Sequence, residues 1–264
     1  MRNRRLALRR RGRIADVRGV TLIELLIVIT IIGLLTTAAL KAYDTSLQAG
    51  RLRSTTRTLD ELAAAIVGNP DLISAGVRVD YGFVGDVGKL PDRLRDLTQS
   101  PSNIDTGLWH GPYVIARVAE NPEGYLIDAW GDSLVYNVDS LTISSRRGLS
   151  VLQTDSWITR RLARRTSDLL SNDFTVVVLD SKGNPPETND SIKVFLRYPT
   201  SGHVRIDSNP TVLGPGNFRY QSMVPVGNHA LRVLAAGDTL TRTVSVAPGG
   251  GDKNWAEVHV SKPF

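Results

Sequence analysis

The fold of this chain is decided by GVTLIELLIVITIIGLL, residues 19–35. From Val20 to Leu40 the only charged residue is Glu24, so the apolar run is about as long as a bilayer-spanning helix requires. A carboxylate near the start of such a run carries a free-energy penalty of up to roughly 2.5–3.5 kcal/mol unless a partner compensates it. The run therefore predicts a membrane helix in which Glu24 needs a partner.

The residues before this run are strongly basic. The chain has 264 residues and a formal net charge of +6, but residues 1–19 alone hold eight arginines and one aspartate. That segment carries +7, which leaves about −1 for the rest of the chain. A basic cluster before a membrane helix indicates a cytoplasmic flank, so we expect no nucleic-acid binding. The chain has no cysteine, which excludes disulfides and thiolate chemistry.

Three interpretations of the first 40 residues remain open. A secretory signal would be cleaved beyond the apolar run, near Thr37-Ala38-Ala39, and a signal anchor would stay uncleaved. Neither of these gives Glu24 a role. In the third interpretation the leader is removed directly before the apolar run.

The third interpretation rests on a family resemblance. Residues 18–26, Arg-Gly-Val-Thr-Leu-Ile-Glu-Leu-Leu, closely resemble the cleavage and methylation motif of type IV pilins and type II secretion pseudopilins. The resemblance implies that a prepilin peptidase cuts between Gly19 and Val20 on the cytoplasmic face and methylates the new amino terminus. The family usually has phenylalanine where this chain has Val20.

The charges created by such a cut agree with this interpretation. Cleavage after Gly19 places an ammonium group on Val20, at the start of a helix in or near lipid. In a filament, Glu24 of a neighbouring subunit can accept that charge. Two opposite charges in hydrocarbon are far less unfavourable as a pair than apart, so pairing favours one stagger between subunits.

The helical pattern continues beyond the apolar run. Apolar residues recur at roughly helical spacing as far as Ile66, and the first proline is Pro70. We expect one helix from about Thr21 to Val67. No proline stands at Lys41, where many pilins have a kinking proline, which leaves Gly33 and Gly50 as the weak points.

Residues 68–158 predict a small antiparallel sheet packed on this helix. We expect a glycine-rich loop at 82–88, a short helix at 90–97, and short strands within 109–115 and 125–136. Within this region, Gly111-Pro112-Tyr113, Asp128-Ala129-Trp130-Gly131 and Val135-Tyr136 are similar to the "GPY … DPWG … Y" layout of the major pseudopilin of type II secretion. Ala129 replaces the family's proline.

The resemblance also implies a place for calcium. Family members often bind calcium in the loop after this motif, which here is residues 141–148 with Asp139 and Asp155 nearby. Two arginines and few carboxylates are a poor ligand set for a hard cation. We therefore expect no cofactor, although these two aspartates leave calcium conceivable.

The carboxy-terminal part has a different composition. Residues 159–172 predict a short basic helix or linker with a solvated face. Residues 173–264 contain short runs rich in β-branched residues, separated by Gly and Pro turns, at 174–179, 192–198, 218–223, 229–234, 240–246 and 255–260. Six or seven strands at this spacing predict a β-sandwich. The sequence pattern of this region, with Val-x-Asp-x-x-Gly-x-Pro near its start, resembles that of carboxypeptidase-regulatory-like, prealbumin-type sandwiches. In those domains the recurring pattern is structural.

No catalytic constellation is evident. The four histidines lie far apart in sequence, and the chain has no His-Glu-x-x-His pair and no Gly-x-Ser-x-Gly elbow. Asp128 has a turn-capping explanation, and the aromatic residues Trp109, Trp130 and Tyr136 have a core-packing explanation. We expect a protein that is not an enzyme.

These observations predict an α+β fold with five segments: a cytoplasmic leader (1–19), a transmembrane and assembly helix (20–67), a pseudopilin-like domain (68–158), a linker (159–172) and a β-sandwich (173–264). The predicted function is a structural subunit of a type II secretion pseudopilus. The expected partners are a prepilin peptidase, other pilin or pseudopilin subunits and an inner-membrane assembly platform. The expected location is the bacterial inner membrane, crossed once, with the later domains in the periplasm. Two alternatives remain: a type IV pilus subunit for adhesion or motility, and a membrane-anchored binding module whose sandwich recognises a glycan or protein.

Overall fold

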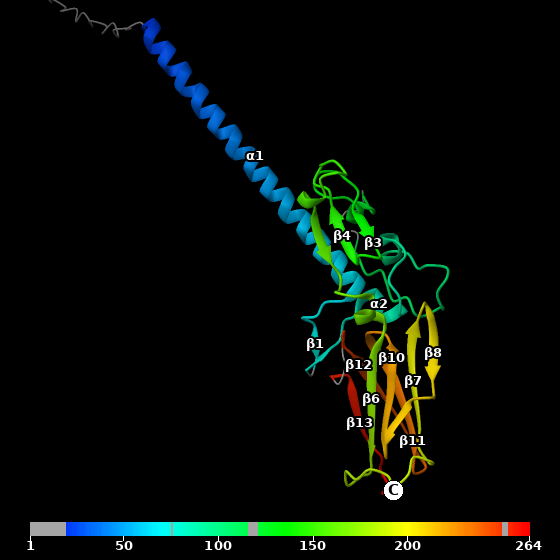
Figure 1. Ribbon diagram of the computed structural model, residues 1–264. Coiled ribbons are helices and arrows are strands. Elements are labelled where there is room, and N and C mark those ends of the chain that lie inside the picture. Colours follow the sequence, from blue (N-terminus) through cyan, green and yellow to red (C-terminus); the bar gives the residue numbers. More distant parts are fainter. Residues whose placement is uncertain (1–19, 75, 116–120, 250–252) are drawn as a thin grey trace, which may run out of the picture. The chain divides into compact units, whose positions relative to one another are not determined.

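The computed structural model describes residues 20–74, 76–115, 121–249 and 253–264 (Figure 1). The predicted leader, residues 1–19, lies outside the described residues, and so does Gly19. The chain divides into two compact units, one ending at Gly50 and the other spanning Arg51–Phe264. It has a long amino-terminal helix followed by a mostly β region with several antiparallel sheets, which confirms the α+β prediction.

Helix α1 (Leu22–Val67) is a single 46-residue element, as the apolar periodicity predicts. Two threonines of the apolar run donate their hydroxyls to the carbonyl four residues earlier: Thr30 to Leu26 at 2.8 Å and Thr37 to Gly33 at 2.9 Å. Hydroxyls satisfied in this way leave no unpaired donor inside an apolar run. The buried residues of α1 begin only at Thr55, in the last third of the helix.

That last third of α1 belongs to the first core of the Arg51–Phe264 unit. Leu59, Leu62 and Ile66 pack with helix α2 (Gly82–Val87), the 3-10 helix η1 (Leu94–Leu97) and Ile143 of β4. A three-stranded antiparallel sheet, in the order β3-β4-β5, is formed by β3 (Val135–Asn137), β4 (Thr142–Ser145) and β5 (Ile158–Arg161). The remaining small elements are the hairpin β1 (Ile73–Ser74) and β2 (Val77–Arg78), the 3-10 helices η2 (Gly124–Leu126) and η3 (Thr154–Ser156), and helix α3 (Thr166–Leu170).

Several local predictions in this region are wrong. The expected glycine loop at 82–88 is helix α2. Gly88 ends this helix with φ 68°, and its N–H donates to the Val84 carbonyl. Residues 109–115 are not a strand, and in 125–136 only Val135–Tyr136 enter β3. The expected short helix at 90–97 is reduced to η1. The expected basic linker, residues 159–172, instead contains most of β5 and all of α3. Strand β5 joins the sheet through β4, where Arg160 pairs with Ile143.

Among the described residues, the sandwich has eight strands, where six or seven were expected. Its two four-stranded sheets have the orders β13-β6-β10-β9 and β12-β11-β7-β8, and all pairs are antiparallel except β13 with β6. Side chains from both sheets, such as Phe174 and Tyr220 from one and Leu196 and Val233 from the other, form one core. The strands are β6 (Asn172–Leu179), β7 (Lys193–Thr200), β8 (His203–Asp207), β9 (Thr211–Gly214), β10 (Asn217–Val224), β11 (Gly227–Ala235), β12 (Asp238–Val246) and β13 (Trp255–His259).

The sandwich and the first core contact each other within the Arg51–Phe264 unit. Val226, just before β11, is buried in the first core. Asp105 accepts the Val204 N–H at 2.7 Å, and the Tyr81 and Ser245 hydroxyls are hydrogen bonded. These contacts join the sandwich to the first core at several points.

Candidate functional site

The candidate site is the beginning of α1. Thr21 is the residue before the helix, and its Oγ1 accepts the Glu24 N–H at 3.2 Å. The Thr21 carbonyl accepts the Leu25 N–H at 3.1 Å. Thr21 is therefore the N-cap of α1, and the spacing Thr-x-x-Glu is that of a capping box. This role of Thr21 was not expected from the sequence, although the Thr-x-x-Glu spacing is present in the motif.

The N-cap separates two of the predicted site residues. Val20 is exposed and lies outside the helix, whereas Glu24 lies in its first turn. A carboxylate there is favoured by the unpaired N–H groups at the helix start. Gly19, the residue predicted to precede the cut, lies outside the described residues. Val20 is exposed and directly precedes the N-cap residue Thr21, so it is accessible to another protein.

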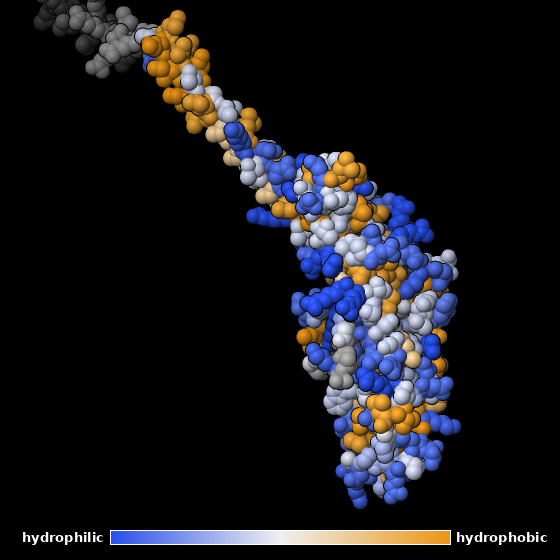
Figure 2. Space-filling model, viewed as in Figure 1, coloured by the Kyte–Doolittle hydropathy of each residue, from blue (hydrophilic) through white to orange (hydrophobic). Residues whose placement is uncertain are grey.

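The first half of α1 presents a long apolar surface. Every residue from Val20 to Gln48 is exposed in the isolated chain, and Figure 2 shows the apolar colouring concentrated on this half of the helix. Among the described residues, α1 is the one helix long and apolar enough to cross a membrane. A surface of this size requires cover by lipid or by other protein. The exposed large apolar side chains before Lys41 are Val20, Leu22, Ile23, Leu25, Leu26, Ile27, Val28, Ile29, Ile31, Ile32, Leu34, Leu35 and Leu40.

Within the second motif, Tyr113 anchors its loop to the first core. Its hydroxyl donates to Asp86 Oδ2 at 2.7 Å and accepts the His110 N–H at 3.1 Å. Its ring meets Phe83 edge-on at 5.6 Å between centroids. Burial raises the pKa of the Tyr113 hydroxyl far above its usual value, so this group stays protonated and acts as a donor.

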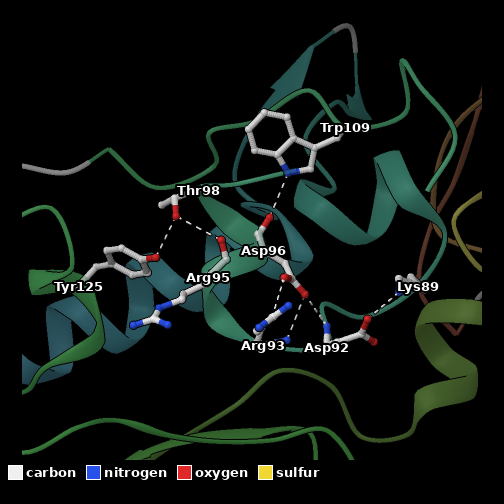
Figure 3. A network of polar contacts seen from close by, with 8 residues as sticks. All are labelled: Lys89, Asp92, Arg93, Arg95, Asp96, Thr98, Trp109 and Tyr125. Atoms are coloured by element: carbon white, nitrogen blue, oxygen red, sulfur yellow. Dashed lines mark hydrogen bonds and ion pairs between the residues drawn. The ribbon is translucent and has the colours of Figure 1, made fainter. Parts of the chain in front are cut away.

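A second network of polar contacts ties Trp109, just before Gly111-Pro112-Tyr113, to η1 (Figure 3). The buried Asp96 accepts the backbone N–H groups of Asp92 and Arg93 at 2.9 and 3.1 Å, and its carbonyl accepts the indole N–H of Trp109 at 3.0 Å. The Thr98 and Tyr125 hydroxyls lie 2.9 Å apart. These contacts use polar groups of η1 and of the residues around the motif for packing.

Asp128 organises the other half of the motif. Its Oδ1 accepts the N–H groups of Trp130 and Asp132 at 2.9 Å each, and its Oδ2 accepts the Ser145 hydroxyl. The Ala129 N–H donates to Thr55 Oγ1 of α1 at 3.1 Å. Asp128 therefore closes a turn that is tied to the helix, which is the turn-capping role expected for it.

The loop after β4, where a calcium site would be sought, is held by cation–π contacts. The guanidinium groups of Arg146 and Arg147 each lie 5.7 Å from a ring centroid, that of Trp157 and Trp130 respectively. Asp139 and Asp155 are exposed. Within the described ranges, no group of three or more His, Asp or Glu residues has a metal-binding arrangement. The absence of a cofactor stays a prediction.

The four histidines have separate partners. His110 pairs with Asp86 at 3.2 Å, His203 with Asp105 at 2.8 Å, and His259 with Glu257 at 2.6 Å. The buried His229 shares a 2.7 Å hydrogen bond with the Pro225 carbonyl. Each histidine thus has a partner within the Arg51–Phe264 unit, and the residues at the start of α1 remain the candidate site.

Comparison with known proteins bears on the same residues. The family model for the prokaryotic N-terminal methylation motif matches residues 14–40, which include Gly19, Val20 and Glu24. No curated protein matches the chain. The motif and the long apolar helix together support a type IV pilin-like protein. The motif implies processing by a prepilin peptidase and assembly with other pilin subunits, and the apolar helix is consistent with membrane anchoring.

Proposed function

We propose that this type IV pilin-like protein is a non-enzymatic structural subunit of a type II secretion pseudopilus. In this proposal it enters the inner membrane with its leader in the cytoplasm and its later domains in the periplasm. The prepilin peptidase cuts after Gly19 and methylates Val20, and an inner-membrane platform adds the subunit to a filament. The observation that carries the proposal is Glu24, the lone charge between Val20 and Leu40, in the first turn of a helix whose apolar side chains are exposed and four residues after the exposed Val20.

The mechanism proposed for assembly is charge neutralisation in an apolar environment. The amine created on Val20 and the carboxylate of Glu24 each resist burial in lipid alone. When the amine of one subunit meets Glu24 of the next, both charges are compensated and the stagger between helices is fixed. The exposed apolar side chains of α1 supply the remaining contact between subunits.

Glu24 has two candidate roles that a single substitution separates. As the third residue of α1 it can complete the capping box, and glutamine serves that role as well as glutamate. Only glutamate can pair with an amine. We therefore expect Glu24→Gln and Glu24→Ala both to be processed and both to fail in filament assembly. If Glu24→Gln assembles like wild type while Glu24→Ala does not, Glu24 acts as a cap and the charge-pair mechanism is wrong.

The choice of a secretion system rests on the resemblance of Gly111-Pro112-Tyr113 and Asp128–Gly131 to the major pseudopilin, together with their packing against α1 through Thr55 and the first core. Deletion of the chain in its host should abolish export of a secreted protein and leave twitching and surface adhesion intact. Loss of motility or adhesion with normal export would assign the subunit to a type IV pilus instead. We propose that the eight-stranded sandwich is of the carboxypeptidase-regulatory-like kind and that the filament carries it as an additional domain of the subunit.

A further inference from the structure

An open groove lies on one flank of the Arg51–Phe264 unit, outside the motifs considered above. It has a volume of about 570 Å³ and is bounded by the β1–β2 hairpin and by strands β12 and β13. The lining residues include Val77 and Val79 from the hairpin side, Thr243–Ser245 from β12, and Trp255 from β13. Ligand sites in proteins typically enclose about 300–1,000 Å³. The groove is therefore large enough for a short segment of another molecule.

The walls of the groove are apolar and open to solvent. Trp255 is 57 % exposed, and Val77 and Val79 are 48 % and 47 % exposed. Leu72 and Ile73, on the other side of the hairpin, extend the same exposed apolar character. An exposed tryptophan next to exposed valines is typical of a contact surface, because tryptophan is the residue type most enriched at binding hot spots.

The charged side chains that line the groove, among the described residues, are all basic. Arg78, Arg242 and Lys253 line it, and no carboxylate does so among the lining residues that the structure describes. Arg242 is fixed by a 2.7 Å hydrogen bond to the Glu257 carbonyl, and the Glu257 carboxylate is paired with His259. The groove therefore favours a ligand that carries negative charge.

Strand β12, which lines the groove, has one open edge. In the described part of the chain, β12 pairs with β11 on one side and is the terminal strand of its sheet. A terminal strand exposes N–H and C=O groups to which an extended peptide can add. The amide side chains that would read sugar hydroxyls are engaged, since Asn228 donates to the Val79 carbonyl and Asn254 bonds both the N–H and the carbonyl of Ala247.

We propose that this groove binds an extended acidic segment of a partner polypeptide. The segment pairs with the open edge of β12 and directs carboxylates to Arg242 and Lys253. It places an apolar side chain against Trp255, Val77 and Val79. This inference concerns the sandwich side of the molecule and does not depend on filament assembly.

The test uses the full chain in detergent and fluorescently labelled peptides, with binding measured by anisotropy. The probes are Glu-Val-Glu-Val-Glu, the basic counterpart Lys-Val-Lys-Val-Lys, and labelled oligogalacturonate as an acidic glycan. We expect the acidic peptide alone to bind, with an affinity that falls as salt is added. Trp255→Ala and Lys253→Glu should each weaken binding by about tenfold.

Two matched variants control for surface changes elsewhere. Leu213→Ala removes an exposed apolar side chain from the edge strand β9, and Lys182→Glu makes the same charge change on a remote turn. Both should bind the acidic peptide like wild type. The proposal is overturned if the acidic peptide does not bind, if Trp255→Ala and Lys253→Glu bind it like the controls, or if only the oligogalacturonate binds.

Discussion

Replacing His229 with glutamine should remove a large part of the acid sensitivity of this protein. The His229 side chain is 2 % exposed, its Nε2 is 2.7 Å from the Pro225 carbonyl, and its ring meets Tyr198 edge-on at 6.0 Å. Its Nδ1 is buried and has no hydrogen-bond partner among the described residues. Burial lowers the pKa of His229 from 6.5 to about 4, so the folded protein holds the ring neutral.

The sign and the size of the effect follow from this pKa. Because the pKa is lower in the folded state, the unfolded chain takes up the proton first as the pH falls below 6.5. Stability is fully present above that pH, declines between pH 6.5 and about 4, and declines no further from this group below about 4. At about 1.36 kcal/mol per pH unit, the wild type loses roughly 2.5 kcal/mol between pH 7.5 and 4.5 through His229.

The measurement is guanidinium unfolding of the full chain in detergent at these two pH values, followed by tryptophan fluorescence. His229→Gln can keep a donor to the Pro225 carbonyl but does not titrate. The wild type should lose about 2.5 kcal/mol more than His229→Gln on acidification. Groups shared by both proteins, such as Asp105, whose pKa is lowered by its hydrogen bond to His203, cancel in the comparison. Equal losses in the two proteins would refute the buried neutral histidine.

Three further predictions concern stability. Gly88→Ala should destabilise the fold by about 2 kcal/mol or more in chemical unfolding, because the residue has φ +68° and a Cβ there would overlap the Pro199 carbonyl; unchanged stability would contradict this. Thr55→Val should cost about 1–3 kcal/mol by leaving the Ala129 N–H unpaired, whereas Thr55→Ser should be close to wild type, and equal values for the two would count against the hydrogen bond. The melting temperature should be the same in calcium and in EDTA, since arginine–tryptophan contacts hold the loop after β4, and a rise with calcium would show a cation site there.

The elements that the sequence predicts well are those with a strong internal pattern. Helix α1 follows from an unbroken apolar run with no proline before Pro70. Strand β6 alternates buried and half-buried residues along its length, and the runs at β7, β10, β11, β12 and β13 were also expected. In these segments local propensity and burial favour the same structure.

The elements that were missed depend on partners distant in sequence. Strand β5 contains Arg160 and Arg161, and it forms because β4 pairs with it and Asp60 of α1 lies 3.1 Å from Arg160. Strand β9 has only four residues, all at least half-exposed or at a turn, so it carries little periodicity. Helix α2 is bounded by glycines that locally indicate a loop.

The candidate site was predictable in part. The position of Glu24 in an apolar run is visible in the sequence, and the structure adds that Thr21 caps the helix and leaves Val20 outside it. The groove at Trp255 was not predictable, because its walls come from a hairpin and from two strands far along the chain. A lone exposed tryptophan has no periodic pattern.

The most direct test of the central claim is the mass of the amino terminus. The full chain would be expressed in a bacterial membrane with and without a prepilin peptidase, purified, and analysed by intact-mass and terminal-peptide spectrometry. We predict a chain that begins at methylated Val20 only when the peptidase is present. A leader that stays intact beside the active peptidase, or a new terminus near Thr37-Ala38-Ala39, would contradict it.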